Sequence, residues 1–414
     1  MRISELTIKN FRALEGEHIF RFSSNITLIA GVNGRGKTAI LDALVLCLSR
    51  LVPKISPSKA RKVAFKTSDI SLGLDEALIN IKANCAGFPV DFSTDYTNDK
   101  IEFVTSLPQS VRIAISNAYG DPSSGDDQAP LAVFYSTDRA SFKIPRLLPS
   151  IVLDGQSMAY NQALVSRLID YKDLMFRYRY ANSERASFGS HVIDAINTAI
   201  TRFMSDFGNL RVETEPSLQL VINKGEKVID IKQLSDGERS FVALISDLGR
   251  RLALANPDLA NPLLGAGVVL IDEIELHLHP KWQLELLENL RTIFPNIQFI
   301  VTTHSPYIIQ TAREGELISL DGAVTVDPYG KSLEEVSKYI MDVENSEYSP
   351  RINEMKQTAE KYLELAASLK GKTGREKEEI EKELNALLEP FTDDVAYTAL
   401  LKAEGKIKIN EANQ

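Results

Sequence analysis

The sequence is poor in cysteine and has no long apolar run. Its 414 residues include two cysteines, Cys47 and Cys85, which lie in apolar surroundings without the spacing of a metal site. A disulfide-stabilised extracellular domain is therefore not expected, and a reducing cytoplasm is the simplest compartment. No apolar run approaches the roughly 18 residues that a membrane-spanning helix needs. We therefore expect a soluble, cytoplasmic protein without a membrane partner.

Positive charge is also in deficit, with 47 Lys and Arg against 56 Asp and Glu and a formal net charge of −9. This balance argues against a protein coated in nucleic acid, although local basic patches remain compatible with it. The first residues, MRISELTIKNF, alternate as a strand does and lack the charged-then-apolar pattern of a signal peptide. The remaining composition is that of a globular protein, 44% hydrophobic and 25% charged, with enough residues for a large core.

Apolar periodicity predicts strands and helices in α/β order. Strand-like runs precede a helix over residues 38–51, and a strand–helix–strand unit is predicted over 267–304. Helical patterns dominate residues 153–207 and return in the tail, roughly residues 345–390, where two helices are separated by GKTG. The tail helices either pack on each other as a hairpin or bind a partner. The predicted organisation is an N-terminal lobe over 1–150, a helical insertion over 151–210, a C-terminal lobe over 211–330 and a helical hairpin over 331–414.

The stretch GVNGRGKT, residues 31–38, fits the phosphate-loop pattern G-x-x-x-x-G-K-[ST] without a mismatch. A buried strand precedes it and a helix follows, so its backbone amides and the helix N-terminus can face phosphate oxygens. Lys37 is predicted to reach the β- and γ-phosphates of ATP, and Thr38 to hold Mg²⁺ through its hydroxyl. The predicted nucleotide-binding residues of this loop are Asn33, Gly34, Gly36, Lys37 and Thr38.

A second acidic motif, GVVLIDE, ends in Asp272 and Glu273 after four apolar residues. Beside a phosphate loop, Asp272 is predicted to bind Mg²⁺ together with Thr38, and Glu273 to act as the general base for water. The alternative is a strand that runs out into solvent. His304 ends the next apolar strand, FIVTTH, at the edge where a γ-phosphate would lie. We therefore predict Lys37, Glu273 and His304 as catalytic residues.

Two further histidines, His277 and His279, follow the acidic pair. Their spacing suits no standard zinc site. A structural role in the turn after Glu273 is the expectation for both.

The stretch LSDGERS, residues 234–240, has the S-x-x-E spacing of a capping box and precedes an apolar-periodic run. The interpretation as a simple helix start is sufficient for these residues alone. A helix N-terminus with a serine and a glycine is also what a γ-phosphate from a neighbouring subunit would need. Asp236 would repel a phosphate there, so we expect it to point away, toward a basic group such as Arg239.

These motifs occur in the order GVNGRGKT, LSDGERS, GVVLIDE and VTTH, after an opening LTIKNFRAL. In this order they resemble the ABC-type ATPases, and within them the RecF/SMC-like group. The fold that this implies is α/β: an ABC-ATPase-type P-loop NTPase head, a mixed β-sheet flanked by helices, with an inserted helical region and a C-terminal helical hairpin. The long gap between Thr38 and Ser235 differs from transporter motors, and a long coiled coil of the chromosome-tethering type is absent from the sequence.

The resemblance also implies roles for individual residues. Arg12 would lie near the bound nucleotide, and His304 would be the switch histidine at the γ-phosphate. Ser235, Gly237 and Glu238 would form the signature loop, which closes over the ATP of another subunit. The stretch EIELHLHPKWQ occupies the position of the D-loop, and residues 135–139 are the candidate for the Q-loop.

DEIELHLHP and the helical tail resemble the compact ATPases of anti-phage defence, Septu PtuA-like proteins and their retron-associated relatives. This resemblance implies ATP and Mg²⁺ as cofactors and a homodimer or higher even oligomer with shared ATP sites. It also implies a partner nuclease of the HNH type that the ATPase regulates, with DNA or a retron RNA–DNA molecule as candidate ligand. The alternatives are a RecF-like repair ATPase that binds DNA in an ATP-dependent way and a self-contained nuclease of the OLD type.

Two stretches are candidates for nucleic-acid contact. Five basic residues fall within residues 54–66, and FRYRY, residues 176–180, interleaves aromatic rings with arginines. A solvated loop explains the first stretch equally well, and packing of one helical face explains the second.

Overall fold

The computed structural model describes most of the chain, in two compact units, Met1–Met341 and Asp342–Gln414. The described residues are 1–56, 62–97, 101–102, 109, 113, 129–137, 142–143, 155–165, 169–180, 190–215, 217–321, 328–341, 350–369 and 372–411.

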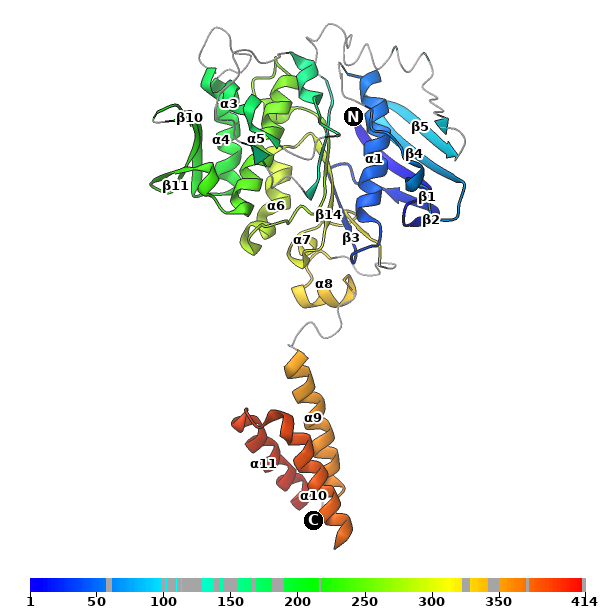
Figure 1. Ribbon diagram of the computed structural model, residues 1–414, viewed down its shortest axis with the longest axis vertical. Coiled ribbons are helices and arrows are strands. Elements are labelled where there is room, and N and C mark those ends of the chain that lie inside the picture. Colours follow the sequence, from blue (N-terminus) through cyan, green and yellow to red (C-terminus); the bar gives the residue numbers. More distant parts are fainter. Residues whose placement is uncertain are drawn as a thin grey trace. The chain divides into compact units, whose positions relative to one another are not determined.

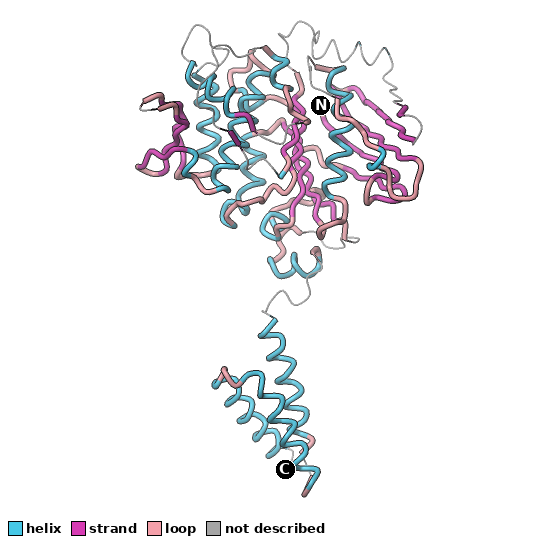
Figure 2. The backbone as a smooth tube through the Cα atoms, viewed as in Figure 1, coloured by secondary structure: helices cyan, strands magenta, loops and turns pink. Residues whose placement is uncertain are grey.

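A parallel sheet forms the centre of the first unit (Figure 2). Its described strands, in sheet order, are β15 (Leu317–Ser319), β3 (Ile26–Ala30), β14 (Ile297–Thr303), β13 (Gly267–Ile271) and β7 (Leu131–Tyr135). All of these except β15 are buried at every residue, as expected where helices cover both faces of a parallel sheet. Because the strands are parallel, the loops that carry the predicted site leave the sheet at one edge.

An antiparallel sheet lies on the other side of α1 (Lys37–Leu51), which contacts strands of both sheets (Figure 1). Its described strands, in order, are β2 (Leu14–Arg21), β1 (Arg2–Phe11), β4 (Glu76–Cys85), β5 (Phe88–Thr97) and β6 (Ile101–Glu102). Thirteen of the 15 residues of α1 are buried, because sheets flank the helix. The two that are not buried are Thr38, a predicted magnesium ligand, and Asp42.

Helices α3 to α6 cover the opposite face of the parallel sheet, with a small antiparallel sheet beyond them (Figure 1). The helices of this unit are α3 (Tyr171–Tyr180), α4 (Ser190–Phe203), α5 (Asp236–Ala255), α6 (Pro280–Ile293), α7 (Pro306–Gln310) and α8 (Leu333–Tyr339). The small sheet contains β10 (Phe207–Glu213), β11 (Gln219–Lys224) and β12 (Lys227–Asp230), and a short parallel pair contains β8 (Phe142–Lys143) and β9 (Ile169–Asp170).

Two residues of the FRYRY stretch, Arg177 and Tyr178, are buried in this unit. Arg177 is 4% exposed and donates from Nε to Asp173 at 3.0 Å, and Tyr178 is 8% exposed. Packing of a helical face, the simpler of the two interpretations, is therefore right, and these two side chains form no surface stacking platform. The basic stretch over residues 54–66 is only partly described, since Lys59 and Arg61 lie outside the described residues.

The second unit differs from the predicted hairpin. Its helices are α9 (Pro350–Ala367), α10 (Arg375–Leu388) and α11 (Val395–Glu411). They share a small core of Tyr362, Ala366, Leu384, Leu388 and Leu401. The prediction of two helices missed α11, since its apolar residues form no continuous stripe at helical spacing.

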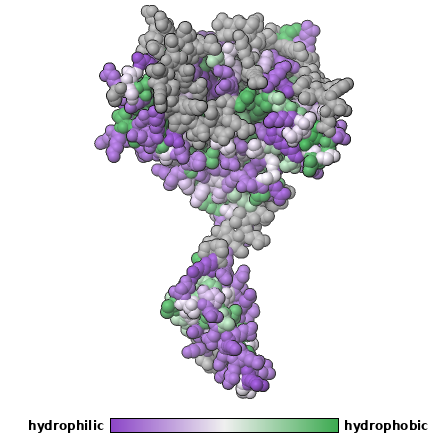
Figure 3. Space-filling model, in the orientation of Figure 1, coloured by the Kyte–Doolittle hydropathy of each residue, from purple (hydrophilic) through white to green (hydrophobic). Residues whose placement is uncertain are grey.

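The surface gives no sign of a membrane span. No helix within the described ranges is long and apolar enough to cross a bilayer. On the face drawn in Figure 3, apolar residues form small groups within a mostly hydrophilic surface.

Candidate nucleotide-binding and hydrolysis site

The phosphate loop connects β3 to α1. Gly36 is the N-cap of α1 with φ 97°, and a Cβ there would lie 3.0 Å from Leu14 Cδ2, so both backbone and packing require glycine. No side chain caps α1, whereas four other helices of this unit have side-chain caps: Ser235, His279, Ser305 and Ser332. An uncapped helix N-terminus at the end of a glycine-rich loop suits an anion such as a phosphate.

The ammonium group of Lys37 lies inside the phosphate loop. Nζ donates to the carbonyl oxygens of Gly31 at 2.7 Å and Val32 at 3.1 Å, and the residue is 6% exposed. Burial lowers the pKa of Lys37, and the carboxylates of Asp321 and Asp272 oppose this shift. Phosphate oxygens can take the place of these two carbonyl oxygens when nucleotide binds.

Asp272 and Thr38 face each other across the site, from β13 and α1. Thr38 Oγ1 donates to Asp272 Oδ2 at 3.1 Å, and Asp272 is 6% exposed. The backbone amide of Asp272 donates to the carbonyl oxygen of Tyr135 at 2.8 Å, which fixes the strand end. A hydroxyl and a carboxylate close together are oxygen donors of the kind that Mg²⁺ prefers, so the two predicted metal ligands fit that ion.

Thr302 of β14 organises both acidic residues. Its hydroxyl donates to Asp272 Oδ1 at 2.6 Å and accepts from the backbone amide of Glu273 at 2.7 Å. Glu273 has φ 46°, in the left-handed region that non-glycine residues seldom adopt. The sequence analysis missed Thr302 because it was treated as part of an apolar strand, although a threonine in a buried parallel strand was an available signal.

Glu275 is a second residue that the sequence analysis left without a role. Its Oε1 accepts a hydrogen bond from the backbone amide of His304, the predicted switch residue at the end of β14. The amide of Ile274 donates to the carbonyl oxygen of Thr302 at 3.0 Å. The turn after Glu273 is therefore tied to the end of β14 by side chain and backbone together.

Arg12 lies beside the start of α1. Its guanidinium forms ion pairs with Asp42, one helical turn after Thr38, and with Asp69 Oδ1 at 3.0 Å. The residue has φ 54° in the tight turn between β1 and β2. Two carboxylates thus hold Arg12 close to the predicted magnesium ligand Thr38.

The predicted capping box of LSDGERS is confirmed. Ser235 Oγ accepts from the amide of Glu238 at 3.4 Å, and Glu238 Oε2 accepts from the amide of Ser235 at 3.0 Å. Burial alone would raise the pKa of Glu238, but hydrogen bonds from Lys224 and Ser235 outweigh it and hold the pKa below its usual value. Asp236 forms an ion pair with Arg239, as predicted.

Gly237 packs against His277, in the stretch predicted to be the D-loop. A Cβ at this position would lie 1.9 Å from the carbonyl oxygen of His277, which itself has φ 64°. The imidazole Nδ1 of His279 accepts from the amide of Lys281 at 3.2 Å and caps α6. The predicted structural role of His279 is therefore confirmed. The close contact with His277 also explains, within one subunit, why position 237 of the predicted signature loop is a glycine.

We expect Gly237→Ala to reduce ATP turnover about tenfold or more, because overpacking at a tight contact costs about 1–3 kcal/mol and must displace one of the two loops. Nucleotide binding to the phosphate loop should be largely retained. Phosphate release and equilibrium nucleotide titration measure the two effects. Asp236→Ala, the matched control, removes atoms from the same loop and should keep near-normal turnover. Unchanged turnover in Gly237→Ala would show that this contact has no part in hydrolysis.

A buried ionic cluster connects α5 to β7. Asp247 accepts from Tyr135 Oη at 2.9 Å, from Arg251 Nε at 2.7 Å and from Arg250, which also donates to Asp173 at 2.7 Å. Tyr135, at the end of β7, therefore links α5, which begins at the predicted signature loop, to the strand end that carries Asp272. Because its buried side chain faces α5, Tyr135 does not suit the Q-loop role predicted for residues 135–139; the last two of these lie outside the described residues.

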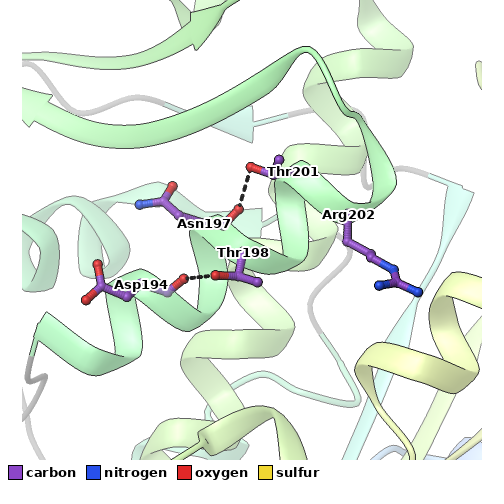
Figure 4. Close-up of a pocket in the computed structure, with 5 residues that line it drawn as sticks. All are labelled: Asp194, Asn197, Thr198, Thr201 and Arg202. Atoms are coloured by element: carbon purple, nitrogen blue, oxygen red, sulfur yellow. Dashed lines mark hydrogen bonds between the residues drawn. The ribbon is translucent and has the colours of Figure 1, made fainter.

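A further hollow, surrounded by polar residues, lies on α4 (Figure 4). It is lined by Asp194, Asn197, Thr198, Thr201 and Arg202. Thr198 and Thr201 donate to carbonyl oxygens one turn back, and Asn197 Oδ1 accepts from the amide of Leu210 at 2.8 Å. The bond of Asn197, together with one from Thr201 Oγ1 to the carbonyl oxygen of Phe207 at 2.8 Å, connects α4 to β10.

Comparison with known proteins relates the chain to AAA-type ATPases. The family model described as "AAA domain, putative AbiEii toxin, Type IV TA system" matches residues 81–310, and one described as "AAA ATPase domain" matches residues 1–119. Among solved structures, an SMC head bound to the C-terminal winged-helix domain of ScpA has a TM-score of 0.47 at 18% identity, covering 77% of this chain and 94% of that one.

Curated relatives carry the names that the sequence resemblance predicted. "Retron Vc95 probable ATPase" of Vibrio cholerae is 38% identical over 41% of this chain and 34% of its own length. "Retron Ec83 probable ATPase" of Escherichia coli is 28% identical over 75% of this chain and 70% of its own length. "Septu protein PtuA" of Bacillus mycoides is 23% identical over 77% of this chain and 40% of its own length. The chain thus spans about a third of the Vc95 protein and most of the Ec83 protein.

The phosphate loop, the paired acidic residues and the strand-end histidine occupy one edge of a parallel sheet, and the first family model covers more than half of the chain. The chain therefore belongs to the AAA-type ATPase family described as "AAA domain, putative AbiEii toxin, Type IV TA system".

Proposed function

We propose that this chain binds and hydrolyses ATP, closes as a dimer around the nucleotide, and thereby regulates a partner nuclease in bacterial anti-phage defence. ATP hydrolysis is supported by one observation: Lys37, Thr38, Asp272 and Glu273 lie together at one edge of the sheet. Thr302 is hydrogen-bonded to both acidic residues there.

Binding relies on the phosphate loop. Lys37 would exchange its hydrogen bonds to Gly31 and Val32 for bonds to the β- and γ-phosphates, and the uncapped N-terminus of α1 would add its dipole. Thr38 and Asp272 would hold Mg²⁺, which neutralises phosphate charge when bound. Asn33, Gly34 and Gly36 shape the loop, and Arg12 is paired with Asp42, one helical turn after Thr38.

Hydrolysis requires a water in line with the γ-phosphate and a group that accepts its proton. Glu273 would accept this proton as a carboxylate, and His304 would contact the γ-phosphate. The products are ADP and phosphate. Thr302 positions Glu273 through its amide, and Glu275 positions His304 through its amide.

The proposal that two subunits share each ATP site rests on the predicted signature loop. Ser235, Gly237 and Glu238 sit at the N-terminus of α5 against the D-loop, and in a homodimer or higher even oligomer they would complete the ATP site of a second subunit. Ser235 Oγ would exchange its weak 3.4 Å cap for a phosphate oxygen on closure.

The proposal of a nuclease partner rests on the names of the relatives and on the motif resemblance. Their names include retron ATPases and Septu PtuA, and the motif resemblance implies a separate HNH-type nuclease. The candidate nucleic-acid ligand is DNA or a retron RNA–DNA molecule.

Lys37→Ala should weaken ATP binding about 10- to 100-fold, because a hydrogen bond to a charged group contributes about 1.5–3 kcal/mol. Equilibrium titration with a fluorescent ATP analogue and Mg²⁺ measures this loss. Lys227→Ala, which removes an exposed lysine from β12, is the control and should bind as the unmodified chain does. Equal binding by the Lys37 variant would contradict the assignment of this loop as the nucleotide site.

The partner is tested by purifying the tagged chain from its native host and identifying co-purifying proteins and nucleic acid. A nuclease that co-purifies and whose activity changes with ATP supports the proposal. DNA cleavage by the chain alone would instead support an OLD-type nuclease.

One observation favours a second function. "DNA replication and repair protein RecF" of Acetivibrio thermocellus is 23% identical over 56% of this chain and 61% of its own length. ATP-dependent, salt-sensitive DNA binding by the purified chain without any partner would support that alternative.

A further inference from the structure

A carboxylate from a distant part of the chain lies against the phosphate loop. β15 pairs in parallel with β3 along Leu317–Ser319, and the amide of Leu320 donates to the carbonyl oxygen of Ala30 at 2.9 Å. This register brings Asp321 beside Gly31, the first residue of the loop, where a Cβ would lie 3.3 Å from Asp321 Oδ2.

Asp321 holds two points of the loop at once. Its Oδ2 accepts from the backbone amide of Val32 at 2.7 Å, and its Oδ1 accepts from Arg35 Nε at 3.1 Å. The Asp321 side chain is 6% exposed, whereas that of Arg35 is 58% exposed. Both main-chain polar groups of Val32 are thereby held, since Lys37 donates to its carbonyl oxygen.

A negative charge in this place needs a reason. An acceptor for the Val32 amide could be a neutral oxygen, such as that of an asparagine. A carboxylate also pairs with Arg35, a positive charge of the loop itself, and it repels the phosphates that the loop is predicted to bind.

We propose that Asp321 is a positioning residue of the ATP site with two separable actions: its oxygen fixes the Val32 amide in the binding shape of the loop, and its charge retains Arg35 and limits nucleotide affinity. This inference rests on the proposed ATP-binding function. Its two actions have opposite signs, because the first favours nucleotide binding and the second opposes it.

Two substitutions separate the actions. Asp321→Asn keeps an oxygen for the Val32 amide and removes the charge, so it should bind nucleotide about three- to tenfold more tightly. This gain should shrink as ionic strength rises, since it is electrostatic. Asp321→Ala removes the oxygen as well, so the loop loses its anchor and binding should be weaker than in the unmodified chain.

The measurement is equilibrium titration of the full chain with Mg²⁺ and a fluorescent ATP analogue, with thermal unfolding to verify that both variants fold. Binding in the order Asn, unmodified chain, Ala, from tightest to weakest, supports the proposal. An Asn variant that binds no more tightly overturns the role of the charge, and an Ala variant that binds normally overturns the role of the oxygen. If the unmodified chain and Lys37→Ala bind equally, the proposed ATP-binding function fails instead.

Discussion

Glu273→Gln should abolish ATP hydrolysis while leaving ATP binding intact. Glutamine matches the size of glutamate but cannot take a proton from water, and a positioned general base contributes about 10²- to 10⁴-fold to the rate. The substitution leaves the main-chain bond from residue 273 to Thr302 in place, so the unusual backbone at φ 46° has no new cause to change. Phosphate binding depends on Lys37 and the start of α1, which the substitution does not touch.

The variant should therefore accumulate as a closed, ATP-bound dimer. Phosphate release, nucleotide titration and light scattering with and without ATP measure the three quantities. Glu285→Gln, at an exposed position of α6, is the matched control and should hydrolyse ATP at the normal rate. Normal hydrolysis by Glu273→Gln would show that the general base has been misassigned.

Glu275→Gln sharpens this test. Its oxygen can still accept from the amide of His304, so a purely positional role predicts only a small loss of turnover. A loss in Glu275→Gln as large as that expected for Glu273→Gln would transfer the general-base role to Glu275.

The motifs predicted which strand ends would carry the chemistry, because the phosphate loop and the acidic pair are each local in sequence. Parallel pairing then brings the ends of β3, β13 and β14 to one edge, as the strand–helix–strand pattern implied. The supporting residues could not be predicted in this way. Thr302 acts on residues about 30 positions earlier, and Asp321 contacts a loop 289 residues away.

The same reasoning explains the errors in the helical regions. A helix was predicted to run continuously into FRYRY, but α3 begins only at Tyr171, directly after the short strand β9. Packing of one helical face was correctly predicted, since Leu174 and Tyr178 are buried. In the tail, α11 was not predicted, because a helix with apolar residues on several sides gives no clear periodic signal.

The second large effect is expected at the buried ionic cluster of α5. Asp247→Ala should destabilise the ATPase unit by about 3–5 kcal/mol, because Arg250 and Arg251 would keep buried charges without their shared carboxylate. Denaturant unfolding measures the change. Glu76→Gln, which breaks a well-exposed ion pair with Lys9, should leave the unfolding midpoint almost unchanged.

The contribution of Asp247 to the free energy of unfolding depends on pH with a defined sign. Burial opposes ionisation of Asp247, but Arg251 and Arg250 outweigh burial and hold its pKa below the usual value. A carboxylate with a lowered pKa stabilises the folded state above the unfolded-state pKa of about 3.9, and this contribution is lost as pH falls through the folded-state pKa. The stability difference between the unmodified chain and Asp247→Ala should thus be constant near neutral pH and shrink only in strong acid.

Tyr135→Phe tests the functional side of the cluster without breaking an ion pair. It removes one hydrogen bond to Asp247, at a cost of about 1 kcal/mol, so the variant should fold. Tyr135 is also bonded through its carbonyl oxygen to the amide of Asp272, so it connects α5, which carries Ser235 and Gly237, to the magnesium-binding edge. Loosening this connection should lower the rate of ATP hydrolysis while nucleotide affinity stays nearly unchanged. Normal hydrolysis in a folded Tyr135→Phe would mean that the cluster only stabilises the fold.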